Sequence, residues 1–106
     1  MDDLAFLNEL FAEIEARRTA ATDTSYSAQL LADLPRAASK LGEEAVETVT
    51  AALAGNDEAL LAESADLIYH WLVVLAARGL TPKQVVEVLK ARAGTSGLAE
   101  KAARGK

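Results

Sequence analysis

Two pairs of carboxylates stand out because the members of each pair are three positions apart. The first pair is Glu44 and Glu47, and the second pair is Glu63 and Asp66. On a helix this spacing places both side chains of a pair on one face. Ligand sets made only of oxygen suit hard cations, Mg²⁺ above all or Mn²⁺, rather than zinc or copper. If the two pairs meet in the fold, they predict a divalent-cation site.

The second pair supports this interpretation more strongly than the first pair does, because of the residues that surround it. A Glu43-Glu44-x-x-Glu47 pattern alone is typical of a solvated helix face. Glu63 and Asp66, however, lie inside a segment, residues 59–77, that is apolar on nearly every side. Such a helix is expected to be buried or sandwiched between subunits, where unpaired carboxylates are costly. Because residues 42–77 contain no Lys or Arg, a cation from solution is the expected partner of these charges.

A di-iron centre is the competing metal site, and it requires a Glu-x-x-His motif on two helices. The residues three positions after Glu44 and Glu63 are Glu47 and Asp66, so that motif is absent. The single histidine, His70, follows Asp66 by one helical turn and has two interpretations. A lone histidine on a largely apolar helix is usually a hydrogen-bonded core residue, but this one is also placed to contact a substrate.

Charge is distributed unevenly along the chain. The net charge is −5, with 16 acidic and 11 basic residues, but residues 41–77 alone carry seven acidic residues and no basic one. The remainder is therefore basic by two charges, and Arg36 and Lys40 lie just before the acidic cluster. One turn apart on a helix, they form either a solvated basic stripe or a contact for an anionic ligand. The acidic balance excludes a broad nucleic-acid-binding face, and the absence of Cys excludes disulfides, thiol nucleophiles and Cys-ligated zinc.

The elements that would position these residues are all helices, since no run of alternating apolar residues predicts a strand. Apolar spacing, caps and breakers predict an amphipathic helix over residues 2–18, a short helical turn through 30–31, and helices over 34–54, 56–77 and 81–93. We therefore expect an all-α bundle of four to five helices in one domain, with a loosely held tail from about residue 95. A short Gly55-Asn56 turn predicts that the two long helices are antiparallel, so their carboxylate pairs face one another.

Three segments of the sequence resemble those of a known family. They are Lys40-Leu-Gly-Glu43-Glu44-Ala-Val-Glu47-Thr-Val, Glu63-Ser-Ala-Asp66-Leu-Ile-Tyr-His70 and Leu-Ala-Ala-Arg78-Gly79-Leu80. The family is phosphoribosyl-ATP pyrophosphatase, within the all-α nucleoside triphosphate pyrophosphohydrolase superfamily. The similarity runs from the Ser25-Tyr26-Ser27 loop to the tail at Ser96-Gly97-Leu98.

The resemblance implies an activity and a set of partners. The expected reaction is Mg²⁺-dependent hydrolysis of 1-(5-phosphoribosyl)-ATP between its α and β phosphates, which yields phosphoribosyl-AMP and pyrophosphate in the second step of histidine biosynthesis. The resemblance also implies a homodimer and makes Glu44, Glu47, Glu63 and Asp66 the metal ligands. We expect a soluble cytoplasmic protein that has neither nucleic acid nor a membrane as a partner, because the longest apolar stretch is short of a membrane span.

The remaining site residues are assigned to proton transfer and substrate binding. Glu47 or Glu43 is the carboxylate expected to take the proton of the attacking water. The residues expected to contact the substrate or its phosphates are Ser25, Tyr26, Arg36, Lys40 and His70. Two alternatives remain: a housecleaning hydrolase of noncanonical nucleoside triphosphates with the same fold, and a non-catalytic helical dimer that binds a divalent ion structurally.

Overall fold

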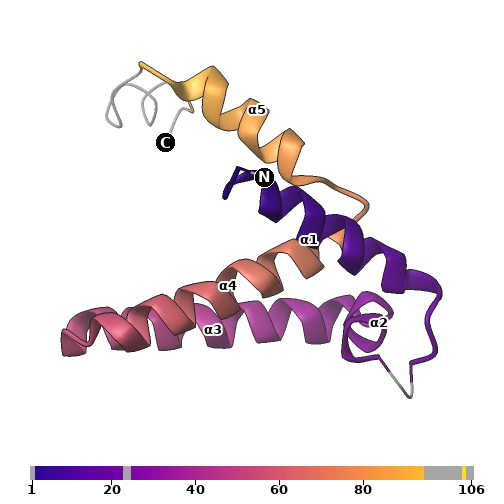
Figure 1. Ribbon diagram of the computed structural model, residues 1–106, viewed down its shortest axis with the longest axis horizontal. Helices are drawn as coiled ribbons and strands as arrows, with labels where there is room; N and C mark the ends of the chain where they lie inside the picture. Colours follow the sequence, from indigo (N-terminus) through magenta and orange to yellow (C-terminus); the bar gives the residue numbers. More distant parts are fainter. Residues whose placement is uncertain (1, 23–24, 95–103, 105–106) are drawn as a thin grey trace.

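The fold consists of helices, as the sequence predicts. The computed structural model describes residues 2–22, 25–94 and 104, and these residues contain no strand. The helices are α1 (Ala5–Ala16), α2 (Tyr26–Leu31), α3 (Leu34–Ala54), α4 (Asp57–Ala77) and α5 (Pro82–Arg92), with a 3₁₀ turn, η1 (Arg17–Thr19), after α1 (Figure 1). The tail from residue 95, for which we expected loose packing, lies outside the described residues apart from Arg104.

The long helices α3 and α4 form an antiparallel hairpin that confirms the predicted arrangement. Gly55 ends α3 in the left-handed region at φ 73°, a conformation that glycine adopts without steric cost. Asn56 then begins α4, because its side-chain oxygen accepts a hydrogen bond of 3.0 Å from the backbone N–H of Ala59. Figure 1 shows the two helices side by side along most of their length.

The first helix is shorter than the sequence predicts. We expected it to span residues 2–18, but the regular helix begins at Ala5 and tightens into η1 at Arg17. At the start, the Asp2 side chain accepts a hydrogen bond of 3.1 Å from the backbone N–H of Leu4, the N-cap residue, which has no side-chain cap of its own. Asp2 therefore lies in the turn that precedes the helix.

The core lies where α1, α2 and the second half of α4 meet. Its most buried large side chains are Ile14, Leu30, Leu72 and Val73. Next to this core, a nitrogen of the Arg18 guanidinium donates a hydrogen bond of 2.6 Å to the carbonyl oxygen of Ala76. A cation at this place satisfies a carbonyl of the last helical turn and complements the negative end of the helix dipole.

The helix α4 is buried on one half and exposed on the other. The residues His70 to Ala76 include five buried side chains, whereas Leu61, near the start of α4, is 73% exposed. Of the two expectations for α4, burial within the chain therefore holds for its second half only, and a place between subunits stays a prediction for its first half. By length and composition alone, α4 is long and apolar enough to cross a membrane, although Glu63 and Asp66 interrupt its apolar sequence. A core helix of a soluble protein passes the same test, and the second half of α4 packs in the core.

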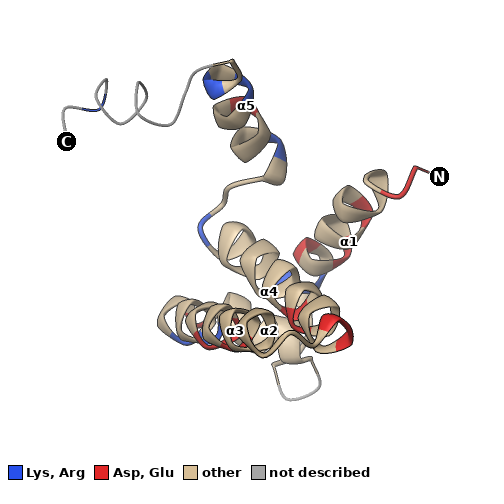
Figure 2. Cartoon of the chain, turned by 90° about the vertical axis from the view of Figure 1, so that its left-hand side faces the viewer, with Lys and Arg blue, Asp and Glu red and all other residues tan. Residues whose placement is uncertain are grey.

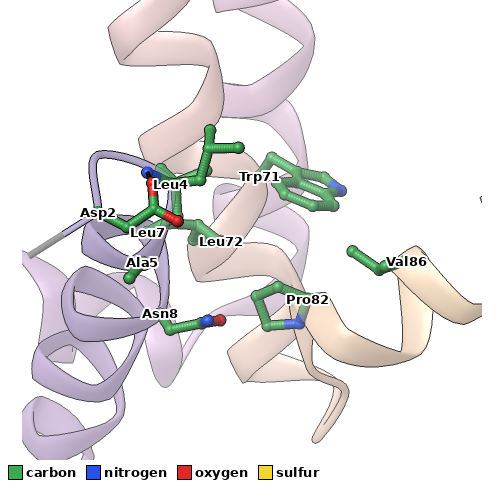
Figure 3. A pocket seen from close by; sticks show the side chains of 9 residues that line it. All are labelled: Asp2, Leu4, Ala5, Leu7, Asn8, Trp71, Leu72, Pro82 and Val86. Carbon is green, nitrogen blue, oxygen red and sulfur yellow. Dashed lines mark hydrogen bonds between the residues drawn. The ribbon is translucent and has the colours of Figure 1, made fainter.

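The helix α5 lies apart from the hairpin and has no buried residue. Thr81 caps it, since the Thr81 hydroxyl accepts from the backbone N–H of Gln84 while the Gln84 side chain accepts from the backbone N–H of Thr81. Between α1, α4 and α5 is a pocket of about 450 Å³ (Figure 3). Its lining is mainly apolar and includes Leu4, Trp71 and Val86.

Candidate active site

The α3–α4 hairpin brings carboxylates from both helices together. One carboxylate oxygen from each of Glu44, Glu63 and Asp66 lies within 4.8 Å of the others. Glu47 lies close to this group, because its charge raises the pKa of both Glu44 and Glu63. The structure thus assembles the four carboxylates that the sequence analysis singled out, and we call these four residues the carboxylate cluster.

Two residues of the carboxylate cluster, Glu44 and Glu63, hold a proton more tightly than an ordinary carboxylate does. Burial raises the pKa of Glu44 from 4.5 to about 7, with further contributions from the hydrogen bond and charge of Glu47 and from the charges of Asp66 and Glu63. Burial also raises the pKa of Glu63, and the charge of Glu47 acts in the same direction. Ionising Glu44 and Glu63 beside other carboxylates is therefore unfavourable, and Glu44 still binds a proton near neutral pH.

Asp66 departs from the sequence expectation. We expected both acidic residues of α4 to point into a packed region, but Asp66 is exposed and Glu63 is only half-buried in the single chain. The reason is that the first half of α4 contacts α3 on one side and solvent on the other. The acidic residues of α4 therefore line an open face of the hairpin.

The carboxylate cluster fits a hard divalent cation by its donor chemistry. One carboxylate oxygen of Glu44, Oε2, is buried and has no hydrogen-bond partner in the part of the chain that the structure describes. Every candidate ligand atom is an oxygen, the donor type that Mg²⁺ and Mn²⁺ prefer. An unpaired buried oxygen costs free energy unless a partner is supplied. Glu44, Glu63 and Asp66 could hold such an ion, with Glu47 beside them.

Two predicted basic residues lie on α3 on the amino-terminal side of the carboxylate cluster. The Arg36 guanidinium is 6.0 Å from the centre of the Tyr26 ring, and its side chain also contacts the Gln29 side-chain oxygen at 3.4 Å. The Lys40 ammonium lies 3.6 Å from a carboxylate oxygen of Glu43. In Figure 2 acidic residues lie on α1 and where α3 and α4 pack together, whereas α5 is mainly basic.

His70 lies between aromatic rings at the edge of this region. Its ring meets those of Tyr26 and Tyr69 edge-on, with centroids 6.2 and 5.2 Å away. It is buried, as a core histidine would be, but Nδ1 has no hydrogen-bond partner among the described residues. Burial lowers the pKa of His70, which keeps the ring neutral near pH 7. His70 is therefore a core residue that retains an unused polar atom.

The loop residues Ser25 and Ser27 have structural contacts. The Ser25 hydroxyl oxygen accepts a hydrogen bond of 3.2 Å from the backbone N–H of Ala28 and so caps α2. The Ser27 hydroxyl lies 2.5 Å from the Tyr69 hydroxyl and ties α2 to α4. Tyr26, between them, is 44% exposed. Of these three residues at the start of α2, Tyr26 thus presents the most accessible side chain.

Comparison with known proteins identifies the family. The family model described as phosphoribosyl-ATP pyrophosphohydrolase matches residues 7–93. The chain belongs to this family. A protein of Caulobacter vibrioides (strain NA1000 / CB15N) named phosphoribosyl-ATP pyrophosphatase is 58% identical over 98 residues, which cover 92% of each chain. Proteins of the same name from Parvibaculum lavamentivorans and Cereibacter sphaeroides (strain ATCC 17029) are 53% and 50% identical, and the matches cover 97% and 96% of this chain and 95% and 100% of the relatives.

In this member of the phosphoribosyl-ATP pyrophosphohydrolase family, the carboxylate cluster and the apolar pocket of Figure 3 consist of different residues. None of the predicted site residues lines that pocket. A second pocket, of about 370 Å³, is lined by Glu47 and Glu63 and by residues between them and the hairpin turn, including Thr50, Asn56 and Ala59. The hairpin therefore offers open space directly beside the acidic residues.

One residue of this region was missed by the sequence analysis. Thr48 follows Glu47 and contacts backbone atoms of both Glu44 and Glu63. Its signal in the sequence was weak, because a threonine within a helix often bonds only to its own preceding turn. Its contact with α4 depends on how the two helices of this phosphoribosyl-ATP pyrophosphohydrolase domain are aligned.

Proposed function

We propose that this chain hydrolyses phosphoribosyl-ATP to phosphoribosyl-AMP and pyrophosphate, the second step of histidine biosynthesis, with Mg²⁺ or Mn²⁺ as cofactor. The observation that carries the proposal is the convergence of Glu44, Glu63 and Asp66 within 4.8 Å in a chain of this family. Relatives that match more than nine-tenths of the chain are named for the same activity. A bound divalent ion supplies charge neutralisation to the phosphates and lowers the pKa of the attacking water.

The residues of the chain have separate tasks in this reaction. Glu44, Glu47, Glu63 and Asp66 hold the cation. Glu47 and Glu43 are also the carboxylates proposed to accept the proton of the water, and both side chains are exposed to solvent. Because the phosphates are anionic, a cluster of carboxylates repels them unless cations lie between the two groups.

The basic and aromatic residues are proposed to hold the substrate. Lys40 and Arg36 supply positive charge to the phosphates from α3. Tyr26 adds an exposed ring beside Arg36, and Ser25 positions this ring through its cap of α2. His70 offers an unused Nδ1, which is buried in the protein alone and would need a small ring movement to meet a substrate atom.

The substrate assay is the direct test of this proposal. The protein is incubated with phosphoribosyl-ATP, with Mg²⁺ or with EDTA, and pyrophosphate is measured. We expect release of pyrophosphate with Mg²⁺ and none with EDTA. Turnover of dUTP or dCTP without turnover of phosphoribosyl-ATP would instead identify a housecleaning hydrolase. Binding of Mg²⁺ without any turnover would identify a structural metal-binding protein.

We also propose that the enzyme is a cytoplasmic homodimer that uses the exposed apolar side chains of the hairpin as its interface. On α3, Val46, Val49 and Leu53 are 66, 58 and 84% exposed, and on α4 Leu61 is 73% exposed. Several large apolar side chains exposed on one hairpin are unfavourable in water and are typical of an interaction surface. Light scattering after size-exclusion chromatography should give the mass of two chains. The mass of one chain at micromolar concentration would contradict this proposal.

A further inference from the structure

Thr48 connects the two helices that carry the carboxylate cluster. Its hydroxyl donates a hydrogen bond of 2.7 Å to the carbonyl oxygen of Glu44, one turn earlier on α3. The same hydroxyl lies 3.2 Å from the carbonyl oxygen of Glu63 on α4. One hydroxyl hydrogen is thus shared between two acceptors in a three-centre arrangement. Each acceptor belongs to the backbone of a residue in the carboxylate cluster, one on each helix.

The position of this contact matters because the carboxylate cluster opposes the close approach of α3 and α4. The carboxylates of Glu44, Glu47 and Glu63 repel one another when ionised. The large apolar residues beside Thr48 on α3, Val46 and Val49, are exposed, so packing between the helices near this level relies on small side chains such as Ala51. A hydroxyl that bridges two backbones acts at the same height along the hairpin as the carboxylates. It therefore opposes both sliding and separation of the two helices at that height.

We propose that Thr48 is a positioning residue that sets the register of α3 against α4 and so holds the carboxylates of Glu44 and Glu63 at the separation that a divalent cation requires. This inference deepens the proposed function and rests on its cation site. Thr48 acts through the backbones of Glu44 and Glu63 and has no assigned contact with the substrate. A shift of one helix along the other would change the distances between ligand atoms without removing any ligand.

The chain supplies a matched control for this proposal. The hydroxyl of Thr50 donates a hydrogen bond of 2.9 Å to the carbonyl oxygen of Val46, the same local pattern two residues further along α3. Thr50 is exposed, and this bond stays within α3. Thr50→Val and Thr48→Val therefore remove the same group from the same helix and leave a β-branched side chain in place. Only Thr48→Val removes a link between the helices.

The test measures Mn²⁺ affinity by isothermal titration calorimetry at pH 8 in the absence of substrate. We expect Thr48→Val to weaken Mn²⁺ binding by about 10-fold or more, the range found for residues that orient metal ligands. Thr48→Ser, which keeps the hydroxyl, and Thr50→Val should remain within about twofold of the wild type by the same reasoning. If Thr48→Val does not fold, Thr48→Ala removes the hydroxyl with a better helix former, and the same loss of affinity is expected.

Several results would overturn the inference. Wild-type affinity in Thr48→Val, an equal loss in Thr50→Val, or no Mn²⁺ binding by the wild type would each do so. Hydrolysis of phosphoribosyl-ATP, measured on the same samples, separates this inference from the proposed function. Absence of hydrolysis together with the expected affinity pattern would reject the function and keep the role of Thr48. Hydrolysis by the wild type with no affinity loss in Thr48→Val would reject the role of Thr48 alone.

Discussion

Replacing Glu44 by glutamine is expected to lower kcat/KM for phosphoribosyl-ATP by at least about 100-fold, because loss of a residue that only orients a metal ligand already costs 10- to 100-fold. Glu44 combines a raised pKa, an unpaired Oε2 and a carboxylate oxygen within 4.8 Å of those of Glu63 and Asp66. The amide of glutamine keeps the shape of the side chain but supplies no negative charge. Pyrophosphate release at saturating Mg²⁺ measures the effect.

The same substitution should stabilise the metal-free protein at pH 8. There the wild type must keep an ionised Glu44 among like charges in a partly buried site, and the neutral amide removes that cost. Urea unfolding in EDTA measures the free energy of unfolding, and Glu13→Gln, on an exposed position of α1, is the control for loss of one charge. Asp66→Asn should also lose activity and keep its fold. Unfolding of the Glu44→Gln or Asp66→Asn protein would contradict a catalytic role and favour a structural one.

The stability of the metal-free protein is expected to fall as the pH rises from about 4.5 through 7. In the folded protein Glu44 keeps its proton to a pKa of about 7, whereas the value for an unperturbed side chain is 4.5. Between these values the folded state binds more protons than the unfolded state does. The contribution of Glu44 to stability is therefore fully present below pH 4.5 and is lost as the pH approaches and passes 7. The raised pKa of Glu63 acts in the same direction.

His70 affects the pH dependence of stability with the opposite sign, and its effect must be separated from that of Glu44. Burial lowers its pKa below 6.5, so its contribution to stability is present above pH 6.5 and is lost as the pH falls through the lower value of the folded state. The Glu44→Gln protein lacks the contribution of Glu44 and retains that of His70. The difference between the pH profiles of the two proteins, measured by urea unfolding in EDTA, therefore isolates the carboxylate.

Addition of Mg²⁺ should reverse the loss of stability at high pH. At a concentration of 100 times its Kd, a ligand stabilises the folded state by about 2.7 kcal/mol. For a domain of this size that free energy corresponds to a rise in Tm of roughly 10 °C or more. The rise, followed by circular dichroism, should be large at pH 8 and small at pH 5.5, where protons compete with Mg²⁺ for the carboxylates. Equal shifts at both pH values would contradict binding at the carboxylate cluster.

The hairpin was predictable because its signals are local. Gly55 and Asn56 act through their own backbone conformation and side chain, so the end of α3 and the start of α4 follow from the sequence. The start of α1 was not predictable in the same way. Leu4 continues the apolar pattern of the helix, yet Asp2 bonds to its backbone N–H in a turn, and periodicity does not distinguish these two states.

The carboxylate cluster was only partly predictable. Spacing within each helix and the short turn were enough to bring Glu44 near Glu63 and Asp66. The exposure of Asp66 was not predictable, because it depends on which side of α4 is left uncovered. The contact of Thr48 with Glu63 was also missed, since it depends on the axial alignment of two helices to within the length of a hydrogen bond.

The short turn between α3 and α4 has a consequence for how the carboxylate cluster forms. Glu44 and Asp66 are 22 positions apart in the sequence, and Thr48 and Glu63 are 15 positions apart. The entropy lost in closing a loop grows with its length, and contacts between residues close in sequence form quickly. The carboxylate cluster is thus a low-contact-order part of the fold, which can be assembled without the distant pairings that join α1 to the end of α4. The carboxylates of the cluster are consequently expected to repel one another from an early stage of folding, when the hairpin forms.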